Sequence, residues 1–364
     1  MNLRLKRLER AWNSFFIRML GRLMRSAPSE RPDWSASPHR VLYLRYDRIG
    51  DMIVSTSLIN AIARSHPTIT LDVLASPANA PVLLGNPNVS SVIVWDKMRP
   101  GGYGRLVREL RRARYDAVID CMVLAPSTTT LLLMLVSGAR HRIGIGGRIN
   151  DYALTVRAAP SSSAIHHIDH SAVLASVFGV DLESVDWQPT LFLADEELSR
   201  AERIWTEYQT ELSGRPRRLL VNISAGRSNR RWPDDRFVEL LRHVRRTAPA
   251  LNVILISSRE EVERGRRISK TSGVPLVSTP LLRDALALGS TTDLVLSPDT
   301  GIGHAASAFR KPAVILFQKG TEEKWGRYRI PGRNVSSADR TLATLTIEPV
   351  LAAVDELIRT DWKT

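Results

Sequence analysis

The feature that most constrains the fold is a regular alternation, from residue 41 onward, of short apolar runs with helix-forming segments. The first set of apolar runs predicts strands at 41–46, 69–75, 91–95, 115–121 and 142–145. The second set predicts strands at 218–223, 252–257, 274–277, 293–297 and 313–317. Strands that alternate with helices in this way are typical of βαβ units and a parallel sheet. We therefore expect an α/β fold with two Rossmann-like, doubly wound parallel-sheet domains.

The chain has 364 residues, which is more than one hydrophobic core normally supports. An extended apolar segment is followed by an acidic, helix-forming run that begins at Asp195, and we place the domain boundary there. The predicted division is an N-terminal segment at 1–40, a first domain at 41–192 and a second domain at 193–364. The single cysteine, Cys121, excludes an intramolecular disulfide framework and fits a reducing compartment.

The N-terminal segment is strongly basic, because residues 1–40 hold nine basic and three acidic residues. Apolar side chains recur in it at helical spacing, and they are Leu5, Leu8, Trp12, Phe15, Phe16, Met19 and Leu23. This pattern is typical of a basic amphipathic helix that lies in a membrane interface. We predict contact with an anionic membrane surface through residues 1–25 and a linker at 26–40. The alternative is a helix that packs on the protein itself or on a partner.

A turn with the sequence S-P-D-T-G-I-G-H at 297–304 joins an apolar strand to a helix-forming run. Such a turn presents unpaired backbone N–H groups and the positive end of a helix dipole, which together hold a phosphate. Asp299, Thr300 and His304 would surround that phosphate with hydrogen-bonding groups. The alternative is an ordinary helix start, capped by Asp299 or Thr300, that binds no ligand.

A second strand-to-helix turn, R-Y-D-R-I-G-D at 45–51, ends in Asp51. Ligands of open parallel sheets bind beyond the carboxyl ends of the strands. Asp51 is therefore placed where a substrate can reach it, or else it only caps the helix that follows.

Two further segments follow predicted strands of the second domain. The loop at 222–233 contains Arg230 among three arginines, whose side chains can grip phosphate oxygens. A solvated basic loop is the alternative. Glu261 follows the next strand, where a carboxylate suits a ribose diol or is simply an acid at a helix start.

Other polar groups are less specific. Arg140 and Arg142 form a basic patch near a strand end in the first domain, which either meets an anionic acceptor or is a solvated face. The histidines at 166, 167 and 170 resemble a metal cluster in composition but lack matching ligands. The sequence has no Walker-type loop, no G-x-G-x-x-G after the first strand and no D-x-D pair. We predict no metal, no cofactor and no nucleic-acid partner.

Four segments together resemble glycosyltransferase family 9, the ADP-heptose:lipopolysaccharide heptosyltransferases. They are R-Y-D-R-I-G-D at 45–51, S-P-A-N-A-P-V-L-L-G-N-P-N-V at 76–89, S-N-R-R-W-P at 228–233, and S-P-D-T-G-I-G-H at 297–304 with K-P-A-V-I-L-F at 311–317. The similarity covers most of the globular part of the chain and leaves out the N-terminal segment.

The resemblance implies a GT-B architecture, with two Rossmann-like domains that face a cleft. It implies inverting, metal-independent transfer of heptose from ADP-heptose to a lipopolysaccharide-core acceptor. The domain at 41–192 would be the acceptor side, and the domain at 193–364 would bind the nucleotide sugar. A lipid-linked saccharide acceptor implies a cytoplasmic protein that is peripheral on the inner face of the cytoplasmic membrane.

The motif match also implies roles for single residues. Asp51 resembles the general base of the family. The implied donor-binding residues are Arg230, Glu261, Asp299, Thr300, Gly301 and His304. Arg230 stands where family members often carry lysine, which keeps the charge but changes the geometry. Separately from the motif match, we assign acceptor binding to Arg48, Arg140 and Arg142 as a hypothesis.

Three alternatives remain at the level of the sequence. A glycosyltransferase of the same family could use another nucleotide sugar in the same frame. A GT-B epimerase would also need two domains, but no lipid-linked acceptor. A non-catalytic module would keep the phosphate turn and bind a nucleotide sugar without turnover.

Overall fold

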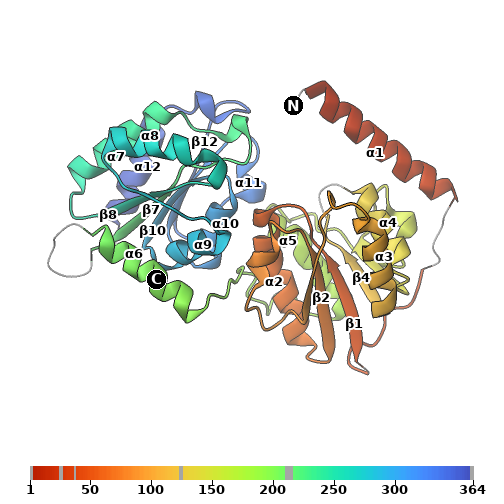
Figure 1. Ribbon diagram of the computed structural model, residues 1–364. Coiled ribbons are helices and arrows are strands. Elements are labelled where there is room, and N and C mark those ends of the chain that lie inside the picture. The colour runs from red at the N-terminus through yellow and green to blue at the C-terminus, as the bar shows by residue number, and fades with distance from the viewer. Residues whose placement is uncertain (1–2, 24–27, 37, 123–125, 210–215, 361–364) are drawn as a thin grey trace. The chain divides into compact units, whose positions relative to one another are not determined.

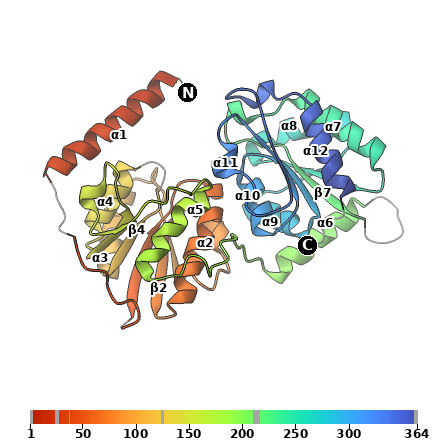
Figure 2. The same ribbon diagram turned by 180° about the vertical axis from the view of Figure 1, so that it is seen from behind.

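The computed structural model describes residues 3–23, 28–36, 38–122, 126–209 and 216–360 (Figures 1 and 2). The chain divides into two compact units. The first comprises 1–48 and 55–187, and the second comprises 49–54 and 188–364. Each unit contains one six-stranded sheet.

The sheet of the first unit has the strand order β3-β2-β1-β4-β5-β6, and all of its strand pairs are parallel. The strands are β1 (His39–Leu44), β2 (Ile69–Ala75), β3 (Ser91–Val94), β4 (Ala117–Asp120), β5 (His141–Ile145) and β6 (Val156–Ala158). The helices that accompany them are α2 (Ile49–Ser65), of which residues 49–54 are grouped with the second unit, α3 (Gly102–Ala113), α4 (Thr128–Val136) and α5 (His167–Ala172). The central strand β1 reads V-L-Y-L and is buried on both faces, as parallel strands covered by helices on each side require.

The sheet of the second unit has the order β12-β11-β10-β7-β8-β9, again with parallel pairs only. Its strands are β7 (Arg218–Asn222), β8 (Asn252–Ile256), β9 (Leu276–Val277), β10 (Leu294–Pro298), β11 (Ala313–Phe317) and β12 (Gly332–Ser336). Its helices are α6 (Asp195–Glu207), α7 (Asp234–Thr247), α8 (Val262–Ser272), α9 (Leu282–Thr291), α10 (Gly301–Ala308), α11 (Glu322–Trp325) and α12 (Glu348–Arg359). Trp232 is fully buried in the core of this unit, and its indole N–H donates to the Leu345 carbonyl at 2.9 Å.

These two parallel sheets confirm the predicted α/β fold of two doubly wound units, and each predicted strand lies within two residues of an observed one. The sequence missed only β6 and β12 among the strands of the described residues. Both lie at a sheet edge, where β6 has three residues and β12 is only partly buried. Neither strand therefore needs the continuous apolar run that identifies a central parallel strand.

The segment that precedes β1 is attached to the first unit. Trp34 is 4% exposed, stacks on Phe178 with ring centroids 4.5 Å apart, and donates its indole N–H to the Val177 carbonyl at 3.0 Å. Ser29 N–H also donates to the Thr155 carbonyl at 2.9 Å. Ser29 and Trp34, which lie in the predicted linker at 26–40, therefore pack against the first unit.

The predicted N-terminal amphipathic helix is present as α1 (Leu3–Leu23), drawn in red in Figure 1. It packs against α4 of the first unit. Within the described ranges, none of the helices has the length and apolar character that crossing a membrane requires.

Candidate functional site

In the second unit, the loops that follow β7, β8 and β10 begin at the carboxyl edge of one sheet. β7 pairs with β8 on one side and with β10 on the other, so these three strands are adjacent at the centre of the sheet. The loop after β7 carries Arg230, the loop after β8 carries Glu261, and the turn after β10 carries Asp299. The topology thus gathers at one edge three residues that the motif match assigns to donor binding and that the sequence separates by tens of positions.

The turn after β10 is held by a set of side-chain hydrogen bonds. Asn222 at the end of β7 donates its amide to Ser297 Oγ at 2.9 Å and to Thr300 Oγ1 at 3.0 Å. The hydroxyls of Ser297 and Thr300 lie 3.1 Å apart. Because the Thr300 hydroxyl is bonded there, it does not cap α10. The first turn of α10 therefore has no Thr300 cap and keeps backbone N–H groups that an anion can accept from.

Asp299 and Arg230 form an ion pair at this turn. Arg230 Nη1 lies 2.8 Å from Asp299 Oδ2, and the same nitrogen donates to the Asp299 carbonyl at 3.2 Å. Asp299 is 4% exposed, so its charge needs this partner. The pair neutralises a carboxylate that would otherwise repel a phosphate at α10, which makes the turn compatible with an anionic ligand.

His304 lies one turn into α10 and is buried, with its Nε2 at 3.9 Å from Asp299 Oδ1. Burial lowers the pKa of His304, the attraction of Asp299 opposes that effect, and Arg230 adds to it. A lowered pKa leaves the ring neutral at physiological pH, so His304 can offer one donor and one acceptor there.

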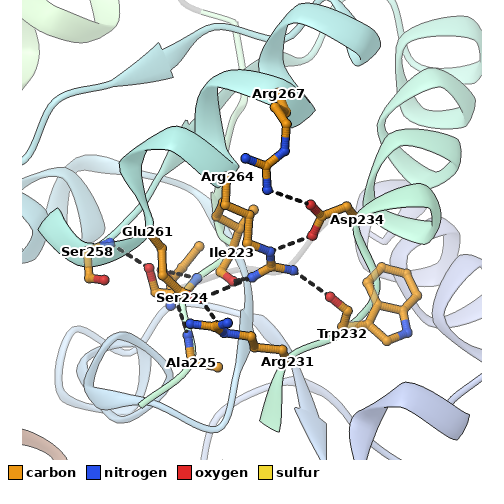
Figure 3. A network of polar contacts seen from close by, with 11 residues as sticks. Ile223, Ser224, Ala225, Arg231, Trp232, Asp234, Ser258, Glu261, Arg264 and Arg267 are labelled. Carbon is orange, nitrogen blue, oxygen red and sulfur yellow. Dashed lines mark hydrogen bonds and ion pairs between the residues drawn. The ribbon is translucent and has the colours of Figure 1, made fainter. Parts of the chain in front are cut away.

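Glu261 lies at the end of a short 3₁₀ turn after β8 and is almost completely buried (Figure 3). Its Oε2 accepts the Ala225 N–H at 2.8 Å, and its Oε1 lies 2.7 Å from Arg231 Nε and 3.5 Å from Arg264 Nη1. The carboxylate that the motif match assigns to a ribose is thus fixed by one backbone donor and flanked by two guanidinium groups.

Arg264 supports this arrangement from α8, as Figure 3 shows. Its guanidinium donates to the carbonyls of Ile223 at 2.7 Å and Trp232 at 2.5 Å, and to Asp234 at 2.5 Å. It therefore ties the loop after β7 to the start of α7. No sequence motif identifies Arg264, because only the fold brings it next to these carbonyls.

At the carboxyl edge of the first sheet, Arg45 organises the turn that leads into α2. It is buried and donates to Ser55 Oγ at 2.9 Å, to the Cys121 carbonyl at 2.7 Å and to Asp47 Oδ2 at 3.2 Å. The first arginine of the R-Y-D-R-I-G-D motif is therefore structural, because it joins the ends of β1 and β4 to α2.

Asp51 lies in the first turn of α2, and its side chain is half-buried. Arg48, the residue before α2, has an exposed side chain, and its carbonyl accepts from Asn79 Nδ2 at 3.4 Å. The Arg48 side chain does not cap the helix. The structure thus places both residues at the carboxyl end of β1, as the sequence predicts for the turn at 45–51.

The same edge contains a buried carboxyl that no sequence motif identifies. Asp120 ends β4 and accepts from Asn150 Nδ2 at 3.0 Å and from the Met122 N–H at 2.9 Å. Burial raises the pKa of Asp120, and these two hydrogen bonds partly oppose the rise. Lys97 lies 4.3 Å from the centre of the Tyr46 ring, and burial lowers the pKa of its ammonium group.

Arg140 and Arg142 lie elsewhere. They flank the first residue of β5, and that residue, His141, pairs with Ala117 at the start of β4. Arg142 donates to the carbonyls of Ala153 at 2.8 Å and Ala139 at 3.3 Å. Both arginines therefore lie at the amino end of the sheet, whereas Arg48 follows the carboxyl end of β1, and the structure does not bring the three together.

His166, the first of the three clustered histidines, has a structural role in the first unit. His166 Nδ1 accepts the Ile168 N–H at 3.1 Å and so caps α5. In the part of the chain that the structure describes, no three side chains of His, Cys, Asp or Glu lie close enough together to hold a metal ion.

Comparison with known proteins gives a consistent result. Residues 103–351 match the model of glycosyltransferase family 9 (heptosyltransferase). The chain is 25% identical over 297 residues to lipopolysaccharide heptosyltransferase 2 of Escherichia coli K12, which covers 76% of this chain and 82% of that protein.

Two solved structures share the fold. A family 9 glycosyl transferase of Veillonella parvula superposes with a TM-score of 0.77 at 17% identity and covers 91% of this chain and 99% of its own. An Escherichia coli heptosyltransferase solved with ADP gives a TM-score of 0.67 at 17% identity, over 87% of this chain and 97% of its own. The two units therefore have the GT-B architecture. Because the family model matches more than half of its length, the chain belongs to glycosyltransferase family 9 (heptosyltransferase).

Proposed function

We propose that the protein transfers a heptose from ADP-heptose to a lipopolysaccharide-core acceptor, with inversion at the anomeric carbon and without a metal ion. The proposal rests on the groups that lie together at the carboxyl edge of the second sheet. There the uncapped start of α10, the Asp299–Arg230 pair and the held carboxylate of Glu261 lie at the ends of adjacent strands. Because the chain belongs to glycosyltransferase family 9, the reaction assigned to this site is glycosyl transfer.

The donor would bind with its diphosphate at the first turn of α10. The N–H groups at Gly301 and its neighbours, with the helix dipole, favour a doubly charged group there. Glu261 would accept hydrogen bonds from the ribose hydroxyls, in the place that Arg231 now occupies at Oε1. The heptosyltransferase solved with ADP supports adenosine as the nucleoside.

The reaction would proceed by one displacement. As the acceptor oxygen forms a bond to the anomeric carbon, its proton passes to the Asp51 carboxylate, and the bond from that carbon to the diphosphate oxygen breaks. ADP leaves with the bonding electrons, and its added charge is stabilised by the N–H groups of α10 and by Arg230. The guanidinium of Arg230 and the N-terminus of α10 would thus stabilise the negative charge of the leaving diphosphate, as a divalent cation does in other enzymes.

The acceptor would be a lipid-linked saccharide, so the enzyme would work in the cytoplasm at the inner face of the membrane. Lipopolysaccharide heptosyltransferase 2 of Escherichia coli, by its name, supports this class of acceptor. Arg48 is the one assigned acceptor residue at the same sheet edge as Asp51. Arg140 and Arg142 are proposed only as a second, distant contact to an extended saccharide.

The test is donor turnover by the full-length protein with lipopolysaccharide-core acceptors and EDTA. ADP-heptose is compared with ADP-glucose, UDP-glucose and GDP-mannose, and ADP release is followed by a coupled assay. We expect acceptor-dependent release from ADP-heptose alone. Preference for another donor would overturn the sugar assignment, conversion without an acceptor would indicate an epimerase, and binding without turnover would indicate a non-catalytic module.

A further inference from the structure

Over residues 11–21, where the structure describes its side chains, helix α1 contacts the first unit through one side. Ile17 is fully buried against Leu131 of α4 and Ala153, and the Tyr152 hydroxyl donates to the Ile17 carbonyl at 2.6 Å. One turn earlier, Asn13 accepts the Thr128 N–H at 3.0 Å, at the start of α4. The docked side of α1 is therefore the side of Asn13 and Ile17.

A different side of α1 carries its largest apolar side chains, and they are exposed. The exposed fractions are 58% for Trp12, 58% for Phe15, 41% for Phe16 and 37% for Met19. These four residues, at i, i+3, i+4 and i+7, form one stripe of the helix, which we call the aromatic face. The first unit packs against the side of α1 that carries Asn13, Ile17 and Leu20 and leaves the aromatic face uncovered.

The three rings of the aromatic face contact one another. Trp12 stacks on Phe16 with centroids 5.7 Å apart, and Phe15 meets Trp12 at 6.1 Å and Phe16 at 5.9 Å, both edge to face. A contiguous exposed patch of this kind differs from scattered surface apolar residues and marks a site of interaction. Such a patch on a helix whose other side is already docked requires a partner outside the unit.

The charge of the segment indicates which partner this is. Residues 1–40 hold nine basic and three acidic residues, and Arg18, which follows Ile17 on the described helix, is exposed. Tryptophan and phenylalanine beside cationic side chains are the composition of helices that lie in the headgroup region of a bilayer. A second copy of the chain would bring two segments of the same positive charge together, which opposes pairing through this face.

We propose that the aromatic face inserts into the boundary between headgroups and acyl chains of a membrane that contains anionic lipid. The contacts of Asn13 and Ile17 then fix the first unit to the bilayer as one body with α1. The inference goes beyond the transfer reaction and does not depend on it, because it concerns surface residues outside the nucleotide site.

The test uses the full-length protein and sedimentation with lipid vesicles, without donor or acceptor. Vesicles of phosphatidylcholine alone are compared with vesicles that also contain phosphatidylglycerol. We expect binding to the anionic vesicles, and a loss of about tenfold or more in the Trp12→Ala/Phe15→Ala variant, which removes two large apolar groups. The Leu281→Ala variant is the control, because Leu281 is 64% exposed and lies in the second unit. It should bind like wild type.

A second variant separates charge from apolar contact. Arg18→Glu should weaken binding to the anionic vesicles and leave the weak binding to neutral vesicles unchanged. Thermal unfolding of each variant confirms that the fold is intact. Equal vesicle binding by wild type and Trp12→Ala/Phe15→Ala would overturn the proposal. So would a change from dimer to monomer in sedimentation velocity without a change in vesicle binding, since the face would then join two copies.

Discussion

Arg231 covers the carboxylate of Glu261: the guanidinium is 51% exposed, the carboxylate is 4% exposed, and Nε lies 2.7 Å from Oε1. A ribose hydroxyl that binds Oε1 has to replace this contact, while the Ala225 N–H keeps Oε2 in place at 2.8 Å. Arg231 therefore competes with the nucleoside for one oxygen of Glu261, according to the donor site proposed above.

We predict that Arg231→Ala binds adenosine more tightly than wild type, by about two- to fivefold, the range expected for a half-exposed ion pair. The buried Glu261 keeps Arg264 at 3.5 Å in this variant, so its charge stays compensated. Isothermal calorimetry with adenosine measures the effect without a contribution from phosphate. The gain should disappear in Arg231→Ala/Glu261→Gln, and a loss of adenosine affinity in the single variant would contradict the competition.

We predict that Asp51→Ala lowers kcat by about 10²- to 10⁴-fold, the usual contribution of a general base. Donor affinity should stay close to that of wild type, since the proposed nucleotide site lies on β8 and β10. Turnover and ADP calorimetry on the same preparation give both quantities. Asp96→Ala is the control, because Asp96 is an exposed acid of the first unit. Retained turnover in Asp51→Ala would remove this residue from the role of base.

We predict that Arg230→Ala weakens ADP binding and also destabilises the second unit, because it leaves Asp299 buried without its ion-pair partner at 2.8 Å. The cost of such a loss is up to about 3 kcal/mol for a pair that is mostly buried. Urea unfolding and ADP calorimetry measure the two effects. Arg230→Lys restores the charge and should recover most of the stability, whereas unchanged ADP affinity in Arg230→Ala would contradict a donor role.

We predict that the protein loses stability in mild acid partly through His304. Burial lowers its pKa in the folded state below the ordinary value of 6.5, so the unfolded chain takes up a proton first as the pH falls. The stabilising contribution is therefore complete above about pH 6.5 and is lost as the pH falls from there through the lowered pKa of the folded state. His304→Asn should reduce the difference in unfolding free energy between about pH 7.5 and about pH 5.5.

The control for this effect is His243→Asn, because His243 lies in the same unit and pairs with Asp355 at 2.9 Å. That variant keeps the buried ring of His304, so it should retain the part of the pH dependence that His304→Asn removes. An unchanged pH dependence in His304→Asn would show that other groups, such as His141, determine the acid sensitivity.

The sequence predicts most of this architecture because central parallel strands are buried on both faces and read as continuous apolar runs. The edge strand β12, G-R-N-V-S, has no such run, and its pairing with β11 is visible only in three dimensions. The turns at 45–51 and 297–304 were recognisable because a polar turn follows each apolar run. Arg140 and Arg142 stand at the start of the predicted strand 142–145, and the structure places them at the start of β5, at the sheet edge opposite the one where Arg48 lies.

The hydrogen-bond network around Glu261 also could not be predicted from the sequence. Arg264 lies three residues further along the chain and reaches Trp232 and Asp234 through the packing of α8 on α7. Helical spacing likewise identified the apolar stripe of α1, and those of its side chains that the structure describes, at Trp12, Phe15, Phe16 and Met19, are exposed, whereas Ile17 beside the stripe is buried. Periodicity shows that a helix has two faces and does not show which of them a neighbouring helix will contact.

Asn13 has a consequence for any shortened form of the protein. Its side chain accepts the Thr128 N–H at 3.0 Å and donates to the Pro126 carbonyl at 2.9 Å, so residues from the first helix complete the start of α4. Cutting the chain before β1 would remove this cap and uncover Leu131 together with the surface beneath Trp34. The N-terminal segment is thus an integral part of the first unit. A change in the activity of a truncated protein would therefore reflect the altered start of α4 as well as the loss of any membrane contact.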